Sequence, residues 1–364
     1  MKESLEQQLF FMRWAIQLGE RGRCTAPPNP WVGCVLVKNG EILGEGYHEA
    51  AGKKHAEIVA IEKAGPLTHG ATAYISLEPC PHQGRTPPCV ERLIQAGIKK
   101  IIIPFLDPDP HVSGKGVEKL QQAGIEVVVG IAKEEAEASL APYLYQRTHR
   151  MPYCVLKCAL SLDGRTAAED GSSQWITGER ARENVHLLRA QSQAILIGAG
   201  TALIDKPRLT VRGVTITKQP LRVLLDSKGS VPVEGPLADC SLAPTLVFTC
   251  SDVQKEHWER SGAEVVLRER LHLKEILKEL GKREIIQLLI EGGSHLHASF
   301  LKEQLANRLV LYFGSCLLGE RGKSFLPDFP IPHIDQAPRL SLVGVQRFDN
   351  DVRLDFLPDD QLSK

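Results

Sequence analysis

The sequence lacks any apolar run long enough to cross a bilayer. Its longest hydrophobic stretches, such as QLLI and IKKIIIPFL, are far shorter than the roughly 20 residues that a spanning helix needs. It also has no surplus of either charge, since 44 basic and 44 acidic residues give a formal net charge of zero. A nucleic-acid-binding protein usually carries a basic excess. We therefore expect neither a membrane nor a nucleic acid as a partner, although a local basic patch is compatible with this balance.

A disulfide framework and a secretory signal are missing as well. The nine cysteines are odd in number and scattered without regular spacing, which is typical of reduced thiols inside the cell. The N-terminal stretch MKESLEQQLFFMRWAIQLGERG is amphipathic and carries acidic residues, unlike a signal peptide. These features favour a cytoplasmic location.

What the sequence does contain is an alternation of helical and strand-like periods in both halves, which favours α/β domains. A chain of 364 residues is long for one hydrophobic core, so two domains are expected. The charged stretch AKEEAEASLAPYLYQRTHR predicts a surface helix between them. The expected domains are therefore 1–150 and 151–364.

The expected elements follow from the same periodicity. In the first half they are helices at 4–22, 55–64, 88–96, 114–124 and 132–150, and strands at 31–37, 41–48, 71–77, 99–105 and 125–130. Asn39-Gly40 between the first two strands is typical of a two-residue hairpin turn. In the second half we expect helices at 177–191 and 271–281, and strands at 153–161, 194–200, 221–227, 244–249, 284–293, 308–313 and 351–357.

Potential zinc ligands stand at the expected helix starts of the first half. His55 and Glu57 open one helix, while Cys80 and Cys89 each follow a proline and Cys89 opens another helix. The positive end of a helix favours the thiolate that zinc requires. One imidazole and two thiolates leave a tetrahedral position open, as in catalytic zinc. We predict one catalytic Zn²⁺ on His55, Cys80 and Cys89, with Glu57 as proton carrier.

The eight residues between the two cysteines leave an alternative open, because paired zinc cysteines are usually two to four residues apart. His82 within this loop could supply a fourth ligand and close the site. The zinc would then be structural, and the chain would be a binding module without catalysis. Against that alternative, Glu57 and the proline-framed loop would have no role.

Four stretches of the first half resemble the deaminase half of the bifunctional riboflavin-biosynthesis deaminase/reductase family. They are TAPPNPWVGCVLVKNGEILGEGYH, HAE, LEPCPHQGRTPPC and DPDPHVSGKG. In that family the long cysteine gap ending in GRTPPC differs from the short gap of deaminases that act on cytidine-type nucleosides or on tRNA. The resemblance implies a cytidine-deaminase-like three-layer α/β fold for residues 1–150. The enlarged loop, with Arg85, would then shape the pocket for a pyrimidine that carries a ribosyl phosphate.

The same resemblance implies further site residues. Asn29 in PNP would contact the pyrimidine ring, although an asparagine between prolines also suits a plain turn. The family usually has Asp-Pro-Asn-Pro where this chain has Asp107-Pro108-Asp109-Pro110. An acid at position 109, where an amide is expected, leaves the role of that residue open.

Two glycine-containing turns follow expected strands of the second half, in ILIGAGTALIDKPRLTVR and in LIEGGSHL, which enters a helix. Such turns present backbone amides to phosphate groups. Neither is a dinucleotide fingerprint, because the third glycine would fall at Leu203. A phosphate-bearing ligand and simple tight turns remain the two interpretations.

Several stretches of the second half resemble the reductase half of the same family. They include KCALSLDGRTA, SQWITG, LLRAQSQAILIGAG, VLLDS and IEGG. The resemblance implies a dihydrofolate-reductase-like α/β fold and NADPH as cofactor. The NADPH would be lined by Ala159, Trp175, Thr201, Asp205, Ser227, Gly293, Ser294, His295, Leu296, His297, Ala298 and Ser299. The substrate would be faced by Lys157, Ser173, Arg189, Leu209, Arg212 and Glu291.

The charged and polar side chains among these residues have candidate roles in binding phosphate or transferring protons. Guanidinium groups suit a phosphate, but Arg189 also fits a solvated helix face and Arg212 a strand end. Lys157 and Glu291 are the candidates for protonating the sugar during reduction. Ser227 and Lys228 place a hydroxyl and a cation where an NAD site often carries an acid, so they could receive the 2′-phosphate of NADPH, although Lys228 also suits a turn. Many relatives have Asp-Asp-Pro where this chain has Asp205-Lys206-Pro207.

The resemblance covers nearly the whole chain and implies two consecutive reactions. The first is deamination of 2,5-diamino-6-ribosylamino-4(3H)-pyrimidinone 5′-phosphate. The second reduces the ribosyl side chain with NADPH and gives 5-amino-6-ribitylamino-uracil 5′-phosphate. The alternative activity is deamination of free nucleosides or of tRNA, which the long cysteine gap and the balanced charge disfavour. The partner is then a small phosphorylated ribosylaminopyrimidine, and a homo-oligomer is compatible with the sequence.

Overall fold

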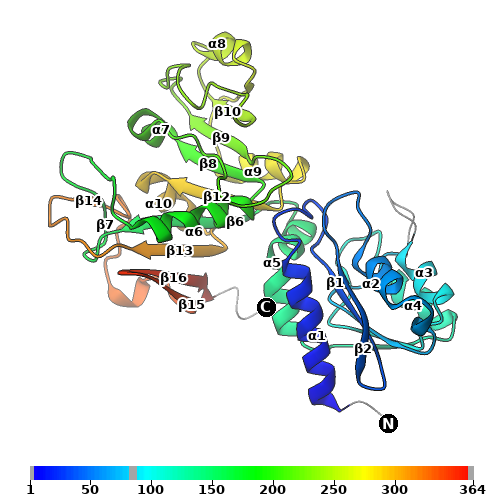
Figure 1. Ribbon diagram of the computed structural model, residues 1–364. Coiled ribbons are helices and arrows are strands. Elements are labelled where there is room, and N and C mark those ends of the chain that lie inside the picture. Colours follow the sequence, from blue (N-terminus) through cyan, green and yellow to red (C-terminus); the bar gives the residue numbers. More distant parts are fainter. Residues whose placement is uncertain (1–3, 82–87, 360–364) are drawn as a thin grey trace. The chain divides into compact units, whose positions relative to one another are not determined.

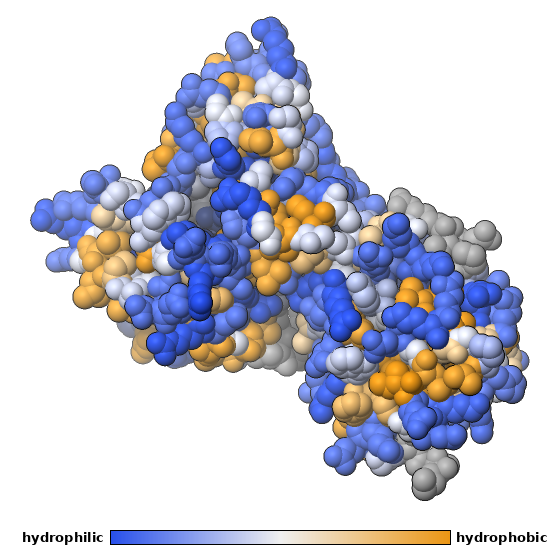
Figure 2. Space-filling view, in the orientation of Figure 1, coloured by the Kyte–Doolittle hydropathy of each residue, from blue (hydrophilic) through white to orange (hydrophobic). Residues whose placement is uncertain are grey.

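The computed structural model describes residues 4–81 and 88–359 (Figure 1). The chain divides into two units, Met1–Arg150 and Met151–Lys364, each with its own sheet and apolar core. Within the described residues, no helix has the length and apolar character that a membrane span needs. Hydrophilic side chains cover most of the face seen in Figure 2, with apolar ones in separate small groups, as is ordinary for globular proteins.

The first unit is built on a five-stranded sheet in the order β2-β1-β3-β4-β5. The strands are β1 (Gly33–Lys38), β2 (Glu41–Tyr47), β3 (Thr72–Ile75), β4 (Lys100–Ile103) and β5 (Glu126–Val129). β1 is antiparallel to β2 and β3, and β3, β4 and β5 are parallel. Asn39 and Gly40 both have positive φ, 54° and 83°, as the predicted two-residue hairpin turn requires.

Helices cover both faces of this sheet (Figure 1). They are α1 (Leu5–Glu20), α2 (Ala56–Ala64), α3 (Cys89–Gln95), α4 (Lys115–Gln122) and α5 (Lys133–His149), with a 3₁₀ turn η1 (Gly65–Thr68). The apolar faces of α2, α3 and α4 share one core with β1, β3 and β4. On the opposite face, the ring of Phe11 in α1 lies 5.3 Å from that of Tyr74 in β3. The result is a three-layer arrangement.

Two glycines of β2 let α2 approach the sheet very closely. A Cβ at Gly44 would lie 2.4 Å from the carbonyl oxygen of Ala60, and a Cβ at Gly46 would lie 2.4 Å from that of Ala56. Any larger residue at either position would push the helix away. This contact determines how close to the sheet the N-terminal end of α2 lies, and His55 and Glu57 are at that end.

The second unit contains a nine-stranded sheet in the order β11-β10-β9-β8-β12-β6-β13-β16-β15. Its strands are β6 (Tyr153–Leu160), β8 (Ala194–Gly198), β9 (Leu221–Asp226), β10 (Thr245–Thr249), β11 (Glu264–Leu267), β12 (Gln287–Gly292), β13 (Arg308–Phe313), β15 (Leu340–Phe348) and β16 (Asp351–Pro358). The strands from β11 through β13 are parallel, while β16 and β15 form an antiparallel edge. β7 (Arg165–Ala167) and β14 (Lys323–Ser324) pair separately.

The helices of this unit are α6 (Glu179–Ala190), α7 (Ala199–Asp205), α8 (Lys255–Arg260), α9 (Leu273–Lys282) and α10 (Ser294–Lys302), with a 3₁₀ turn η2 (Ile334–Gln336). Phe248, Leu280 and Phe300 are among the buried side chains that join the sheet to α9 and α10. The expected strand at 194–200 ends early, because Gly198 caps α7 and Gly200 lies inside it. The expectation of a strand through residue 200 is therefore wrong.

Candidate functional site

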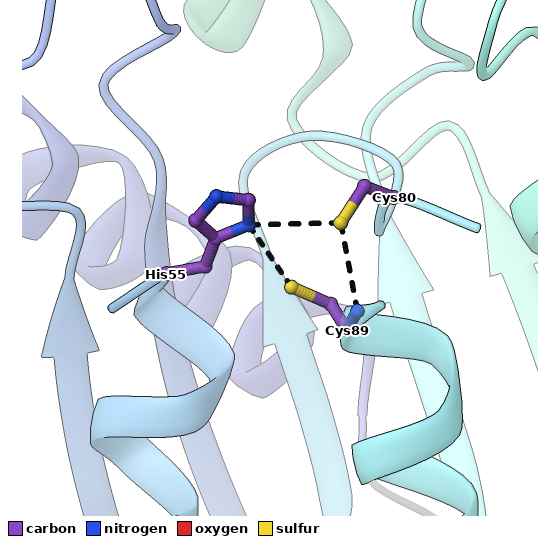
Figure 3. A group of neighbouring side chains, drawn as sticks. All are labelled: His55, Cys80 and Cys89. Carbon is purple, nitrogen blue, oxygen red and sulfur yellow. Dashed lines mark hydrogen bonds between the residues drawn. The ribbon is translucent and has the colours of Figure 1, made fainter. Parts of the chain in front are cut away.

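His55, Cys80 and Cys89 converge in the first unit (Figure 3). His55 caps α2, Cys89 is the first residue of α3, and Cys80 lies in the loop after β3. The Nδ1 atom of His55 lies 3.1 Å from the sulfur of Cys89 and 3.6 Å from that of Cys80. Tetrahedral zinc with ordinary bond lengths would need ligand atoms about 3.5–3.8 Å apart. The 3.6 Å separation meets this requirement, and the 3.1 Å separation is about 0.4 Å shorter. The donor set, one imidazole and two thiols, is one that zinc accepts.

The two cysteines have opposite electrostatic environments. Hydrogen bonds from the Cys89 thiol and backbone N–H, together with His55, lower the pKa of Cys80 to about 4 despite its burial. The hydrogen bond to Cys80, then burial and the nearby Glu57, raise the pKa of Cys89 well above its usual value. The thiolate form of Cys80 is therefore favoured even without a metal. Cys89 would need the positive charge of a divalent cation to lose its proton.

Glu57 lies in the first turn of α2 and is only 3% exposed. Burial raises its pKa above the usual value, although His55 partly offsets this effect. Among residues 4–81 and 88–359, Glu57 forms no ion pair with lysine or arginine. A carboxyl group with a raised pKa next to a metal-binding cluster is suited to proton transfer near neutral pH.

His48 joins Asn29 to this cluster. Its Nδ1 lies 3.1 Å from the carbonyl oxygen of Lys54, and its Nε2 lies 3.1 Å from Nδ2 of Asn29. The same ring meets that of His55 edge to face, with centroids 5.0 Å apart. Sequence reasoning missed His48. The available signal was a histidine at the end of the hairpin, seven residues before His55.

Two predicted residues of the cysteine loop, His82 and Arg85, lie outside the described residues. Within the part of the chain that the structure describes, His55, Cys80 and Cys89 are the one group with metal-binding geometry.

In the second unit, most predicted residues lie at the carboxyl ends of parallel strands, where α/β proteins bind ligands. Thr201 and Asp205 are in α7 after β8, Ser227 follows β9, and Gly293 caps α10 after β12. A Cβ at Gly293 would lie 3.2 Å from the hydroxyl oxygen of Thr201, so the two strand ends meet closely. The N-terminal end of α10 therefore lies close to Thr201 in α7.

Arg189 and Glu291 pair with each other rather than lying free. Nε and Nη2 of Arg189 donate to the two carboxylate oxygens at 2.6 and 2.8 Å, and Nη1 donates to the carbonyl of Thr210 at 3.1 Å. Arg212 is exposed, and its backbone N–H donates to Nδ1 of His186. Of the two predicted arginines, Arg212 is therefore the one whose guanidinium is exposed.

Lys157 in β6 lies among several predicted residues. Burial raises the pKa of Asp205 above its usual value, and the charge of Lys157 partly offsets this rise. The same charge acts to lower the pKa of Glu291. Its ammonium lies 5.9 Å from the ring centroid of Tyr312. The structure thus groups Lys157 with Asp205 and Glu291.

The remaining predicted residues have varied environments. Trp175 is 68% exposed and stacks with Arg182, whose guanidinium carbon is 4.4 Å from the ring centroid. Within the described chain, no hydrogen bond or ion pair joins Ser173 or Trp175 to Lys157. The side chains of Leu209, His297 and Ala298 are buried. Ala159, Ser294, His295, Leu296 and Ser299 lie in β6 or α10, and the hydroxyl of Ser299 donates to the carbonyl of His295.

Comparison with known proteins identifies both halves. The family model "Cytidine and deoxycytidylate deaminase zinc-binding region" matches residues 5–104, and "RibD C-terminal domain" matches residues 152–354. The chain is 48% identical over 340 residues to riboflavin biosynthesis protein RibD of Chlamydia trachomatis serovar D, covering 90% of this chain and 89% of that one. The chain belongs to the RibD family.

Further RibD proteins agree along the whole length. RibD of Escherichia coli K12 is 39% identical, with 96% of this chain and 98% of that one covered. The structure of Acinetobacter baumannii RibD, form 1, superposes with a TM-score of 0.90 at 38% identity, covering 98% of this chain and 99% of that one. The deaminase/reductase of Thermotoga maritima gives 0.88 at 35% identity, covering 97% and 99%.

Membership of the RibD family confirms the expected fold class, a cytidine-deaminase-like N-terminal part followed by a dihydrofolate-reductase-like C-terminal part. It also confirms the expected activity. The chain is a bifunctional enzyme of riboflavin biosynthesis that deaminates the phosphorylated diaminopyrimidine and reduces its ribosyl side chain. Its cofactors are zinc for deamination and NADPH for reduction.

Proposed function

We propose that Met1–Arg150 carries out the deamination and Met151–Lys364 the reduction. The single observation that carries the first assignment is the convergence of His55, Cys80 and Cys89 with the buried Glu57. The matches of the two family models to residues 5–104 and 152–354 support the same division. The alternative of a purely structural zinc would leave without a function a buried acid that, among the described residues, forms no ion pair with lysine or arginine.

In the deaminase site, Nδ1 of His55 and the sulfurs of Cys80 and Cys89 would hold the zinc. Zinc bound there is a Lewis acid that makes a hydrolytic nucleophile available near neutral pH. Glu57 accepts a proton from that nucleophile, delivers one to the ring nitrogen and then assists the departure of ammonia. The raised pKa of Glu57 suits both acceptance and return of the proton.

Asn29 would orient the pyrimidine ring in the same site. Because the carbonyl of Lys54 fixes the imidazole of His48, and that ring in turn contacts the Asn29 amide, the amide is held in one orientation. A preorganised side chain loses little entropy when it binds substrate.

In the reductase site, backbone amides at the start of α10 would hold the cofactor phosphates, and Ser227 and Lys228 its 2′-phosphate. NADPH supplies the hydride. Arg189 lowers the pKa of Glu291, so this carboxyl group is a poor proton donor at neutral pH. We therefore assign proton donation to Lys157, and phosphate binding to the exposed Arg212.

The partner and location follow from the same observations. The substrate is a small phosphorylated molecule, and the balanced charge supports the absence of a nucleic-acid partner. All nine cysteines are free thiols, which supports a cytoplasmic location. A homo-oligomer is compatible with this proposal.

The test combines metal analysis with two assays on the purified chain. We expect one zinc per chain, ammonia release from the diaminopyrimidine, and NADPH oxidation with the deaminated product. A chain without zinc and without substrate-dependent NADPH oxidation would end the proposal. A chain with zinc that releases no ammonia would favour the structural alternative.

A further inference from the structure

The segment 107–117 follows β4, runs into the first turn of α4 and contains the whole motif DPDPHVSGKG, residues 107–116. The reactions described so far assign no role to it. It also carries Asp109, the acid that stands where the family resemblance predicts an amide. Its contacts reach two different parts of the deaminase site.

The first set of contacts leads to Cys80 through Glu78, a carboxylate only 4% exposed that lies two residues before the cysteine. Its Oε2 accepts the backbone N–H groups of Asp107 and Gly114, both at 3.0 Å. Its Oε1 accepts those of Gly116 and Val117 at 2.9 and 3.2 Å. The four N–H groups form charge-assisted hydrogen bonds with this buried carboxylate, and these bonds fix the positions of both of its oxygens.

The backbone around Cys80 is held on both sides by the same region. A Cβ at Gly116 would lie 2.3 Å from the carbonyl oxygen of Pro79, so the two backbone segments are in direct contact there. The ammonium of Lys119 donates to the carbonyl of Pro81 at 2.8 Å. Residues of α4 therefore hold the backbone on both sides of Cys80.

The second set of contacts leads to Asn29 through Arg147 of α5. Oδ2 of Asp109 lies 3.4 Å from Nε of Arg147, and both side chains are largely buried. Nη2 of Arg147 donates to the carbonyl of Pro28 at 3.3 Å, directly before Asn29. The guanidinium also lies over the ring of Tyr143, 5.1 Å from its centroid. Asp109 thus orients Arg147, and Arg147 in turn holds the backbone of the loop just before Asn29.

We propose that the segment 107–117 is a brace that positions two groups of the deaminase site independently. Through Glu78 it positions Cys80, and through Asp109 and Arg147 it positions Asn29. The inference rests on the proposed roles of Cys80 and Asn29. It gives Asp109 a function that an amide would perform less well, because an uncharged group pairs more weakly with a buried guanidinium.

The two sets of contacts predict separate effects, one on zinc binding and the other on substrate binding. In Glu78→Gln, the new NH₂ group faces backbone N–H donors, so zinc affinity should fall about 10- to 100-fold, as for other residues that orient metal ligands. At saturating zinc its KM should stay near the wild-type value. In Arg147→Met, zinc affinity should be unchanged and KM should rise about 10-fold, with a smaller change in kcat.

The readouts are chelator competition for zinc, the thiolate-to-metal absorption of the cobalt-substituted chain, and KM and kcat for ammonia release. Arg147→Lys keeps the charge facing Asp109 and should recover part of the KM. Glu118→Gln, on the exposed side of α4, is the matched control and should change neither quantity. NADPH-dependent reduction by the same chain reports that the rest of the protein is intact.

A second variant tests the same contact independently, in case Glu78→Gln does not fold. Gly116→Ala places a methyl group against the carbonyl of Pro79 and should also weaken zinc binding without raising KM. If Glu78→Gln and Gly116→Ala bind zinc like the wild type, or if all brace variants weaken zinc and substrate binding together, the proposal is overturned.

Parallel variants separate this inference from the proposed function. Cys80→Ser should lose zinc and Asn29→Ala should raise KM. If either does not, the role proposed for that residue is wrong. If both behave as expected while Arg147→Met leaves KM unchanged, the roles stand and the brace is refuted.

Discussion

Arg189 and Glu291 form a bidentate ion pair in the second unit, with the exposed fractions of their side chains only 14% and 8%. Burial alone would raise the pKa of Glu291, but the guanidinium charge and its hydrogen bonds lower it below the usual value. Every nitrogen of Arg189 donates a hydrogen bond, to Glu291 or to the carbonyl of Thr210. The pair therefore acts as one buried unit.

Glu291→Gln should destabilise the second unit, because it leaves the Arg189 charge buried without its anion. Breaking such a pair typically costs about 3–5 kcal/mol. Reduction should fall with stability while deamination is retained, as urea unfolding and the two assays would measure. The double variant Arg189→Met/Glu291→Leu should recover much of the stability but not the reduction, and Glu320→Gln on the surface is the control. Wild-type stability in Glu291→Gln would contradict the importance of the pair.

His297 should make the second unit lose stability in acid. Burial lowers its pKa to about 4, and its Nδ1 has no hydrogen-bond partner among the described residues. Since the unfolded chain takes up this proton at about pH 6.5, acidification favours the unfolded state between about pH 6.5 and 4. The loss should be about 1.4 kcal/mol per pH unit and about 3 kcal/mol in all.

The stability of the second unit is measured as the urea midpoint of its unfolding transition at several pH values. This transition is recognised because added NADPH, which binds the second unit, shifts it. His297→Gln removes the titrating group and should flatten the dependence on pH. An equal slope in the variant and the wild type would assign the acid sensitivity to other groups.

Lys228 should contribute to the preference for NADPH over NADH. It is exposed directly after Ser227, which follows β9, and we propose that it binds the extra phosphate of NADPH. Lys228→Glu should raise the KM for NADPH and change that for NADH much less, because only NADPH carries the repelled charge. Lys302→Glu, at the far end of α10, is the charge-matched control. Equal effects of Lys228→Glu on both cofactors would place Lys228 in an ordinary turn.

How far the sequence predicts this structure depends on how local each signal is. The turn at Asn39-Gly40 and the helix starts at His55 and Cys89 follow from neighbouring residues, and each of these elements is present. The edge strand β15 was not expected, because several of its apolar side chains are exposed and its register shifts between Leu342 and Gly344. The glycines near α7 suggested a turn, whereas Gly198 caps a helix.

The site shows the same limit. His55, Cys80 and Cys89 are recognisable because their residue types and helix positions already indicate zinc. Glu78 was overlooked because its partners are the backbone amides of residues 107–117, which no local pattern connects to it. Which groups a buried carboxylate meets is decided by tertiary packing.

Cutting the chain near residue 150 should give two pieces that fold separately, since each unit has its own sheet and core. The first piece should bind zinc and the second should bind NADPH, as metal analysis and fluorescence titration would report. A C-terminal piece that is insoluble under all conditions, while the full chain is soluble, would show that it does not fold independently.

The central claim, a zinc deaminase site in which Glu57 moves protons without binding the metal, is tested most directly by Glu57→Gln. Zinc content and both half-reactions are measured for this variant, for Cys89→Ser, and for Glu62→Gln, an exposed control in the same helix. Glu57→Gln should keep its zinc, lose about 10²–10⁴-fold or more in deamination, and still reduce the deaminated pyrimidine. Cys89→Ser should lose zinc and deamination together. Loss of zinc from Glu57→Gln would instead make Glu57 a ligand or a structural support, and undiminished ammonia release would remove it from the mechanism.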